Sequence, residues 1–141
     1  MEGVGAGRAG RAARATAVAD LETRDVEGLI NNAGFATSGD FADEDPARIA
    51  ELVSLNCLAL TLLSRAAVPG MVARGRGAIV NVASTAAFQP IPTMGTYAAS
   101  KAFVLRLSMA MWHELRPPGV PVLALCPGAP APGLCTVSGH P

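Results

Sequence analysis

Short apolar runs alternate with two long helical patterns along the middle of this chain. The runs are residues 28–34, GLINNAG, which end in a polar corner, residues 77–84, GAIVNVAS, and residues 120–126, VPVLALC. The run at 77–84 is apolar on both alternating faces, as in a parallel strand that helices cover on each side. The order strand, helix, strand, helix, strand predicts right-handed parallel crossovers in an open α/β sheet.

Both helical patterns have clear ends. The first begins at Asp45 and Pro46, because Asp caps exposed N–H groups and Pro fits the first helical position, and it runs to about Ala73. The second spans about residues 95–115 and is stopped by the Pro-Pro-Gly sequence at 117–119. Apolar residues of the first helix recur at spacings of three and four and predict one buried stripe, made of Leu52, Leu55, Ala59, Leu62, Leu63 and Ala66.

The ends of the chain carry weaker patterns. Residues 1–14 are rich in Gly, Ala and Arg without periodicity, and we expect a loose arm or the end of a helix there. The run ATAVADL at 15–21 is partly β-branched and precedes charged residues, which predicts a strand entering a turn. Residues 129–141 are rich in Pro and Gly and predict an irregular tail. The 141 residues are expected to form a single domain around one core.

Charge and cysteine content argue against several classes of function. Eleven basic residues balance eleven acidic ones, so the chain lacks the electrostatic footprint of a nucleic-acid-binding or membrane-surface protein. The longest uncharged stretch is broken by Pro and Gly, so we expect no membrane-spanning helix. Cys57, Cys126 and Cys135 offer neither a disulfide framework nor the spacing of metal ligands. They are expected to be reduced thiols in a cytoplasmic protein.

A tyrosine and a lysine lie four residues apart on the second helix. This spacing places Tyr97 and Lys101 on one face, where the ammonium stabilises the phenolate and helps the phenol to work as a general acid and base. Ser84 ends a buried strand, the place where open α/β sheets have their ligand crevice. In isolation such a Tyr and Lys are usually a surface pair and such a serine is usually a turn residue. Their function therefore depends on what accompanies them.

Several motifs accompany them in one order along the chain. These are Asn31-Asn32-Ala33-Gly34, Asn56, Ser84, Tyr97-Ala98-Ala99-Ser100-Lys101 and Cys126-Pro127-Gly128. The combination resembles the short-chain dehydrogenase/reductase family over residues 15–128. The resemblance implies a Rossmann-like parallel sheet flanked by helices. It also implies an oxidoreductase that transfers a hydride between NAD or NADP and a small-molecule substrate with a carbonyl or secondary alcohol group.

The resemblance further implies a catalytic role for four residues. Tyr97 would be the acid and base on the substrate oxygen, and Ser84 would polarise and orient that oxygen. Lys101 would hold the nicotinamide ribose and stabilise the phenolate. Asn56 would keep a water in the proton relay through its backbone.

Other residues are implied in cofactor binding. The Asn-Asn-Ala-Gly corner would support the central sheet and the ribose side, Asp20 would meet the adenine ring, and the Pro-Gly pair at 127–128 would lie beside the nicotinamide. The full set of expected cofactor contacts is Asp20, Asn31, Ala33, Gly34, Tyr97, Lys101, Pro127 and Gly128.

The chain departs from the family pattern at both ends. The phosphate loop T-G-x-x-x-G-x-G is missing, and the G-x-G-x-x-G at residues 5–10 follows only four residues, which leaves no strand to deliver its N–H groups. Ten residues between Asp20 and Asn31 are too few for a crossover helix. Pro130 and Pro132 stand where the family has a Val and a Thr. We therefore expect a family member truncated at both ends, without the first βαβ unit, whose dinucleotide binding is weak or absent.

Two other hypotheses stay open at this point. In this family the two helices also pair with those of a second subunit, so we expect a homo-oligomer formed through residues 46–73 and 95–115. A non-catalytic fragment that uses these helices for self-association or partner binding is the alternative function. A product that does not fold alone is the third.

Overall fold

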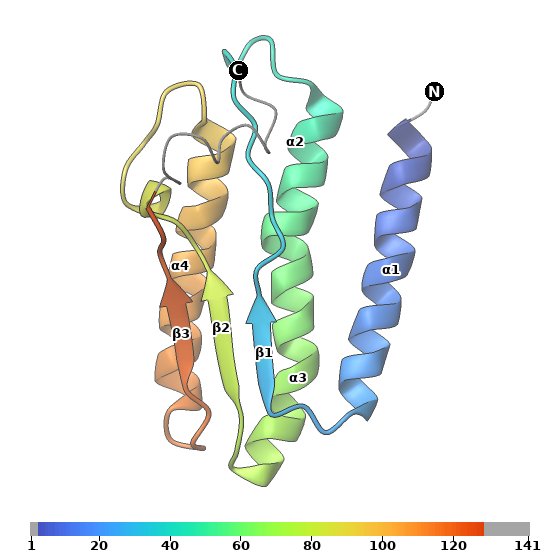
Figure 1. Ribbon diagram of the computed structural model, residues 1–141, viewed down its shortest axis with the longest axis vertical. Helices are drawn as coiled ribbons and strands as arrows, with labels where there is room; N and C mark the ends of the chain where they lie inside the picture. Colours follow the sequence, from blue (N-terminus) through green and yellow to red (C-terminus); the bar gives the residue numbers. More distant parts are fainter. Residues whose placement is uncertain (1–2, 129–141) are drawn as a thin grey trace.

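The protein forms a three-stranded parallel sheet with helices packed against it, as a computed structural model describes for residues 3–128, with side chains from residue 10 onward. The strands are β1 (Gly28–Asn31), β2 (Ala78–Val82) and β3 (Val122–Leu125), in the spatial order β1-β2-β3 (Figure 1). Leu29 is opposite Ile79, and Val80 is opposite Leu123. The prediction of a parallel, Rossmann-like α/β sheet is confirmed for the described residues.

The two long helices lie where the sequence predicts them. A continuous helix runs from α2 (Pro46–Val53) through a π-helical segment, η1 (Ser54–Ala59), into α3 (Leu60–Arg74). Asp45 caps it by accepting a hydrogen bond from Ala47 N–H at 2.9 Å. Gly75 ends it in the left-handed conformation, φ 61°, that glycine adopts without strain. The second helix, α4, spans Gly95–Leu115 and keeps its predicted limits.

The π-helical segment changes which residues of the first helix face the core. Each turn of a π-helix holds an extra residue, so the apolar stripe rotates. Leu52, Ala59 and Leu60 are buried, whereas Leu55 and Leu62 of the predicted stripe are 36% and 38% exposed. The polar side chain of Asn56 is turned inward instead, and only 2% of it is exposed. The regular stripe predicted from helical spacing is therefore wrong at Leu55 and Leu62.

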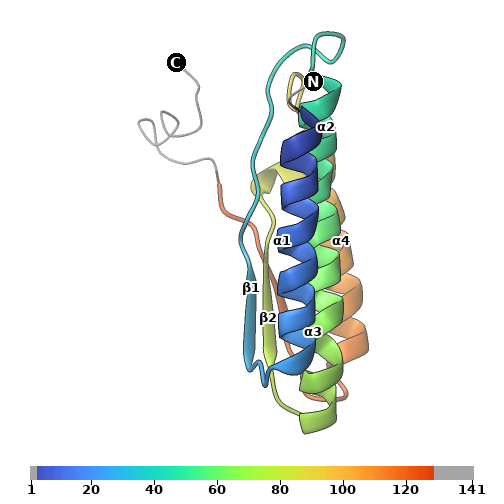
Figure 2. The same ribbon diagram turned by 90° about the vertical axis from the view of Figure 1, so that its right-hand side faces the viewer.

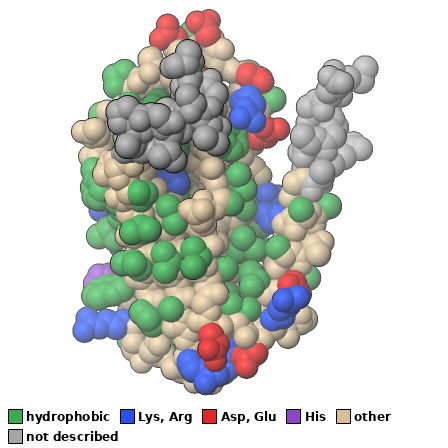
Figure 3. Space-filling model, viewed as in Figure 1, with side chains coloured by type: hydrophobic (Ala, Val, Ile, Leu, Met, Phe, Trp, Pro, Cys, Tyr) green, Lys and Arg blue, Asp and Glu red, His purple; other side chains and the backbone are tan. Residues whose placement is uncertain are grey.

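All helices of the described residues cover the same face of the sheet (Figure 2). Ile30 and Leu123 are consequently 70% and 57% exposed, and hydrophobic side chains are spread over the open face (Figure 3). The prediction that helices cover β2 on both sides is wrong for residues 3–128. Within that part of the chain β1 pairs only with β2, so its other edge is free.

The N-terminal segment is a helix, so the strand predicted at residues 15–21 is wrong: Gly3–Thr23 form helix α1. Of the two alternatives for residues 1–14, a loose arm or the end of a helix, the helix agrees with the structure from Gly3 onward. Alanine is the best helix former, and its abundance here outweighs two β-branched residues. Arg14, Val18 and Leu21 are half-buried at spacings of four and three, and α1 packs against α3. The glycines at 5–10 lie inside this helix, and residues 129–141 lie outside the described residues.

The core lies between the sheet and the helices α3 and α4. Met71, Ile79 and Val120 are almost fully buried in one cluster, and Leu60, Ala83 and Val104 form a second cluster nearer the carboxyl ends of the strands. The helix Pro46–Arg74 is 29 residues long, and its length and composition alone would allow it to cross a membrane. Part of this apolar composition belongs to the core, where Leu52, Leu60 and Met71 are buried, and other large apolar side chains of the helix stay exposed.

Four buried polar side chains cross the core in a line. Asn31 Nδ2 donates to Ser64 Oγ on α3 at 3.0 Å and to Asn81 Oδ1 on β2 at 2.8 Å. Asn81 Nδ2 then donates to Ser108 Oγ on α4 at 2.9 Å, and Ser108 donates to Val104 O. A buried amide is costly unless it is hydrogen-bonded, so these bonds fix the two strands and two helices relative to one another.

Candidate active site

The predicted catalytic amine and phenol meet at the carboxyl end of β2. Lys101 Nζ lies 5.8 Å from the centre of the Tyr97 ring, one turn away on α4. The same ammonium donates to the carbonyl oxygen of Val82 at 2.9 Å, two residues before Ser84. Only 7% of Lys101 is exposed, whereas Tyr97 is half-buried. The amine, the phenol and the strand end that carries the serine are therefore in one place.

Ser84 lies at the start of a short helical turn that follows β2. Its Oγ accepts a hydrogen bond from Ala86 N–H at 3.1 Å and caps the 3-10 helix Thr85–Phe88, which packs against α4. Thr85 N–H donates to Pro127 O at 3.0 Å, so the loop after β3 is held beside Ser84. The predicted nicotinamide turn at Pro127 is thus next to the predicted catalytic serine, as the carboxyl ends of neighbouring parallel strands require.

The Asn-Asn-Ala-Gly corner after β1 reaches the same region. A Cβ atom added to Gly34 would lie 2.9 Å from Asn56 Oδ1 and 3.6 Å from Lys101 Nζ. The backbone therefore approaches Asn56 more closely than a side chain at Gly34 would allow, whereas the distance to Lys101 is an ordinary contact. Ala33 and Gly34 are exposed, and Asn56 is buried behind them.

Burial governs the two ionisable side chains at the centre of the site. Desolvation lowers the pKa of Lys101 because the charged ammonium loses water, and its interaction with Cys57 acts in the opposite, raising direction. Burial raises the pKa of the Cys57 thiol, and the nearby Lys101 partly offsets that rise. Cys57 is therefore a protonated thiol at neutral pH, as expected of a small core residue rather than a nucleophile.

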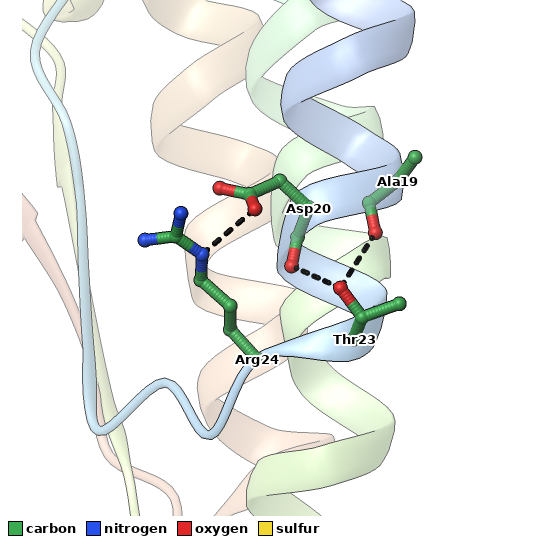
Figure 4. A network of polar contacts seen from close by, with 4 residues as sticks. All are labelled: Ala19, Asp20, Thr23 and Arg24. Atoms are coloured by element: carbon green, nitrogen blue, oxygen red, sulfur yellow. Dashed lines mark hydrogen bonds and ion pairs between the residues drawn. The ribbon is translucent and has the colours of Figure 1, made fainter.

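Two of the predicted cofactor residues have other roles in this structure. Asn31 points into the core, where its side-chain amide donates to Ser64 and Asn81. Asp20 lies near the end of α1 and pairs with Arg24 at 2.7 Å (Figure 4). The end of α1 is beside the amino ends of the strands, opposite the site (Figure 1). The strand that was expected to place Asp20 at the adenine ring is absent, so that placement is wrong.

Sequence reasoning missed a buried serine and a backbone segment that complete the site. Ser100 contacts both Asn56 and the Tyr97 carbonyl, and Phe35 forms two backbone hydrogen bonds with the Asn56 amide. A serine within an apolar helical run was the available signal, because a buried hydroxyl requires a partner. Among the described residues, no three His, Cys, Asp or Glu side chains are grouped as metal ligands would be.

The sheet is parallel, and the tyrosine, the lysine and the serine lie at the carboxyl end of β2, where open α/β sheets bind their ligands. This is the arrangement that the resemblance to nucleotide-dependent oxidoreductases implies. The family model described as short chain dehydrogenase matches residues 7–135. The chain therefore belongs to the short-chain dehydrogenase family. The match starts before residue 15 and ends after residue 128, so it is longer than the region recognised from motifs.

Relatives and a solved structure agree with this assignment. The chain is 40% identical over 103 residues to 2-(S)-hydroxypropyl-CoM dehydrogenase 3 of Xanthobacter autotrophicus, covering 73% of this chain and 40% of that protein. It is 38% identical over 131 residues to the inactive 2-(S)-hydroxypropyl-CoM dehydrogenase 2 of the same organism, covering 92% and 57%. A short-chain dehydrogenase from Sphingobium yanoikuyae in complex with NADPH superimposes with a TM-score of 0.80 at 43% identity, covering 82% and 46%. The chain thus spans roughly half the length of these proteins.

Proposed function

We propose that this chain carries the proton-transfer part of an oxidoreductase that interconverts a carbonyl group and a secondary alcohol. The observation that supports the proposal is the position of Lys101, which is buried between the Tyr97 ring and the Val82 carbonyl at the end of β2. An ammonium is rarely buried without a function, because its desolvation is costly.

The donors at this site fit the ribose and nicotinamide end of NAD or NADP. An ammonium has three N–H donors, and Val82 takes one, so two remain for the hydroxyl groups of a ribose. The loops at Gly34 and Pro127 lie on either side of the amine and the serine. The nicotinamide group, when bound, supplies or accepts the hydride.

The chain's own residues would move the proton. During reduction the Tyr97 hydroxyl donates its proton to the substrate oxygen, and during oxidation the phenolate takes it back. The Lys101 ammonium stabilises the phenolate between these steps. Ser84 Oγ accepts from Ala86 N–H, so its own proton is left to donate to the substrate oxygen and orient it.

Affinity for the whole dinucleotide is a separate matter. Much of it comes from a glycine-rich loop and a helix N-terminus that bind the pyrophosphate, and the 141 residues contain no T-G-x-x-x-G-x-G sequence. We therefore propose that the 141-residue chain by itself binds NADPH with a Kd on the order of millimolar. We also propose a cytoplasmic location for it.

An NADPH titration followed by NMR tests this function. Tyr97 is the only tyrosine of the chain, so a ring-labelled sample gives one tyrosine signal. The signal should shift and saturate in the millimolar range, while the indole N–H of Trp112, near the far end of α4, should not move. Lys101→Met should abolish the shift. An unmoved Tyr97 signal at saturating NADPH would refute the site, whereas micromolar affinity would refute only the explanation for weak binding.

Self-association through the helices is the second candidate function. Large apolar side chains stay exposed on both long helices: Leu55, Leu58 and Leu62 on the first, and Phe103, Met109 and Trp112 on the second. Isolated soluble monomers rarely leave so many on adjoining elements. Sedimentation equilibrium distinguishes the candidates, because a dimer that ignores NADPH supports self-association alone, and a monomer whose Tyr97 signal responds to NADPH supports the oxidoreductase.

A further inference from the structure

The hydroxyl group of Ser100 makes hydrogen bonds both to the backbone of Tyr97 and to the side chain of Asn56. It donates to the backbone carbonyl of Tyr97 at 2.7 Å and accepts a hydrogen bond from Asn56 Nδ2 at 3.0 Å. Only 4% of the serine is exposed. Ser100 is therefore too buried to reach a substrate. It lies within the turn of α4 that begins at Tyr97 and ends at Lys101, and its hydroxyl binds the first carbonyl of that turn.

Both N–H groups and the oxygen of the Asn56 side-chain amide are hydrogen-bonded. One N–H of Nδ2 donates to Ser100, the other donates to Phe35 O at 3.0 Å, and Oδ1 accepts from Phe35 N–H at 3.1 Å. The residue is 2% exposed and lies inside the π-helical segment. A buried amide whose two N–H groups and oxygen are each hydrogen-bonded has one low-energy orientation, so it holds the loop at Phe35 and the α4 helix at a fixed separation.

We propose that Ser100 is a positioning residue for Tyr97. Its hydroxyl links the Asn56 amide to the helical turn that carries the phenol and the amine. Because Asn56 also binds the loop that follows β1, Ser100 fixes that turn relative to the loop. The inference rests on the proposed function, because positioning matters only if Tyr97 and Lys101 react.

The physical reason is the cost of leaving Asn56 with a missing partner. Without the Ser100 oxygen, one Nδ2 hydrogen is unpaired in a buried place, and the amide must rotate or admit a water molecule. The carbonyl of Tyr97 also loses its second hydrogen bond. The turn from Tyr97 to Lys101 then opens more often, because its attachment to the first helix has gone.

Ser108 is a matched control within the same helix. It is 2% exposed, its hydroxyl donates to a backbone carbonyl one turn earlier, and its oxygen accepts from the Nδ2 of a buried asparagine, Asn81. Removing either hydroxyl therefore costs similar bonds in a similar environment. Only Ser100 is connected to Tyr97, so the two variants separate positioning from simple stability.

Amide hydrogen exchange measures the difference. In α4 the Lys101 N–H faces the Tyr97 carbonyl one turn earlier, so its exchange rate reports opening of that turn. Ser100→Ala should lower protection at Lys101 by about tenfold relative to the far half of α4, since roughly one buried hydrogen bond with its unpaired partner is lost. The single Tyr97 ring signal should shift at the same time. Ser108→Ala should leave the Tyr97 signal unchanged. In that variant the protection of Lys101 should also stay unchanged relative to the other amides of α4.

Ser100→Thr retains the hydroxyl and should restore most of the protection at Lys101. Should Ser100→Ala fail to fold, Ser100→Cys replaces it, because a thiol is a weak donor of similar size and should give an intermediate loss. Equal effects of the Ser100 and Ser108 variants on Tyr97 would overturn the inference. Hydrogen exchange is measured without cofactor, so it tests the positioning role of Ser100 independently of NADPH binding. A negative exchange result would overturn the positioning role, whereas a negative NADPH titration would overturn the proposed function.

Discussion

Replacing Asn31 by alanine should destabilise the protein far more than the same replacement at its neighbour Asn32. The two asparagines are adjacent in the sequence, but Asn31 is buried and Asn32 is exposed. Asn31 Nδ2 makes two hydrogen bonds, to Ser64 Oγ and to Asn81 Oδ1. The substitution removes both and leaves the Asn81 oxygen without that donor in a residue that is 0% exposed.

The magnitude follows from these bonds. Each buried hydrogen bond contributes about 1 kcal/mol net, and a stranded buried acceptor costs about 1–3 kcal/mol, so the loss of two bonds with one stranded acceptor in Asn31→Ala should lower the free energy of unfolding by about 3–5 kcal/mol. For a chain of this size roughly 3 °C of melting temperature corresponds to each kcal/mol, which gives a fall of roughly 9–15 °C. Asn32→Ala should stay within about 0.5 kcal/mol of the parent, as exposed substitutions usually do.

Urea unfolding, followed by circular dichroism and by the fluorescence of the single Trp112, measures both variants. A Ser64→Ala change in the Asn31→Ala background should add little, because the bond between them is already lost. If both asparagine variants unfold at the same urea concentration, the buried polar line does not fix the strands and helices as described.

Three further predictions concern other parts of the molecule. Burial lowers the pKa of Lys101, so the folded state binds its proton less tightly than the unfolded chain, and the free energy of unfolding should rise with pH from that lowered pKa to the ordinary lysine pKa of about 10.4. Urea titrations at increasing pH should show this rise for the parent protein and not for Lys101→Met. Gly77→Ala should destabilise the protein by about 1–3 kcal/mol, because φ is 154° and the new Cβ would overlap the Met71 side chain at Cγ. Gly28→Ala is the control, since its Cβ meets no atom within 4 Å, and coinciding melting curves of the two variants would contradict this prediction. Leu123→Ser, at a side chain 57% exposed on the open sheet face, should reduce aggregation measured by light scattering and leave the melting temperature nearly unchanged.

Much of the fold could be predicted from local signals. Helix α4 has a long apolar pattern and ends before a Pro-Pro-Gly sequence, and the first helix starts at an Asp-Pro pair. Residues that start or stop a helix therefore predict these ends. The strand predicted at residues 15–21 is wrong because so short a run has no periodicity that distinguishes a strand from a helix. The alanine content of the segment favours the helix that is found. One-sided covering of the sheet also could not be predicted, because apolar composition does not say which partner covers each face.

The candidate site was predictable as a set of motifs but not as a geometry. The four-residue spacing put Tyr97 and Lys101 on one face, and the end of a buried strand put Ser84 near them. The π-helical segment was not predictable, because it depends on tertiary bonds from Asn56 to Phe35 and Ser100 rather than on local propensity.

The proposed function requires Lys101 and Tyr97, the only lysine and the only tyrosine of the sequence, to lie close together, with the lysine buried and the tyrosine half-buried. Selective isotopic labelling of both residue types gives one signal set for each, and a nuclear Overhauser measurement reports whether they are close. We predict cross-peaks between the Lys101 ε-methylene and the Tyr97 ring, together with a Lys101 pKa below its ordinary value. A Lys101 side chain that shows no cross-peak to Tyr97 and titrates like a lysine in water would show that this site does not form.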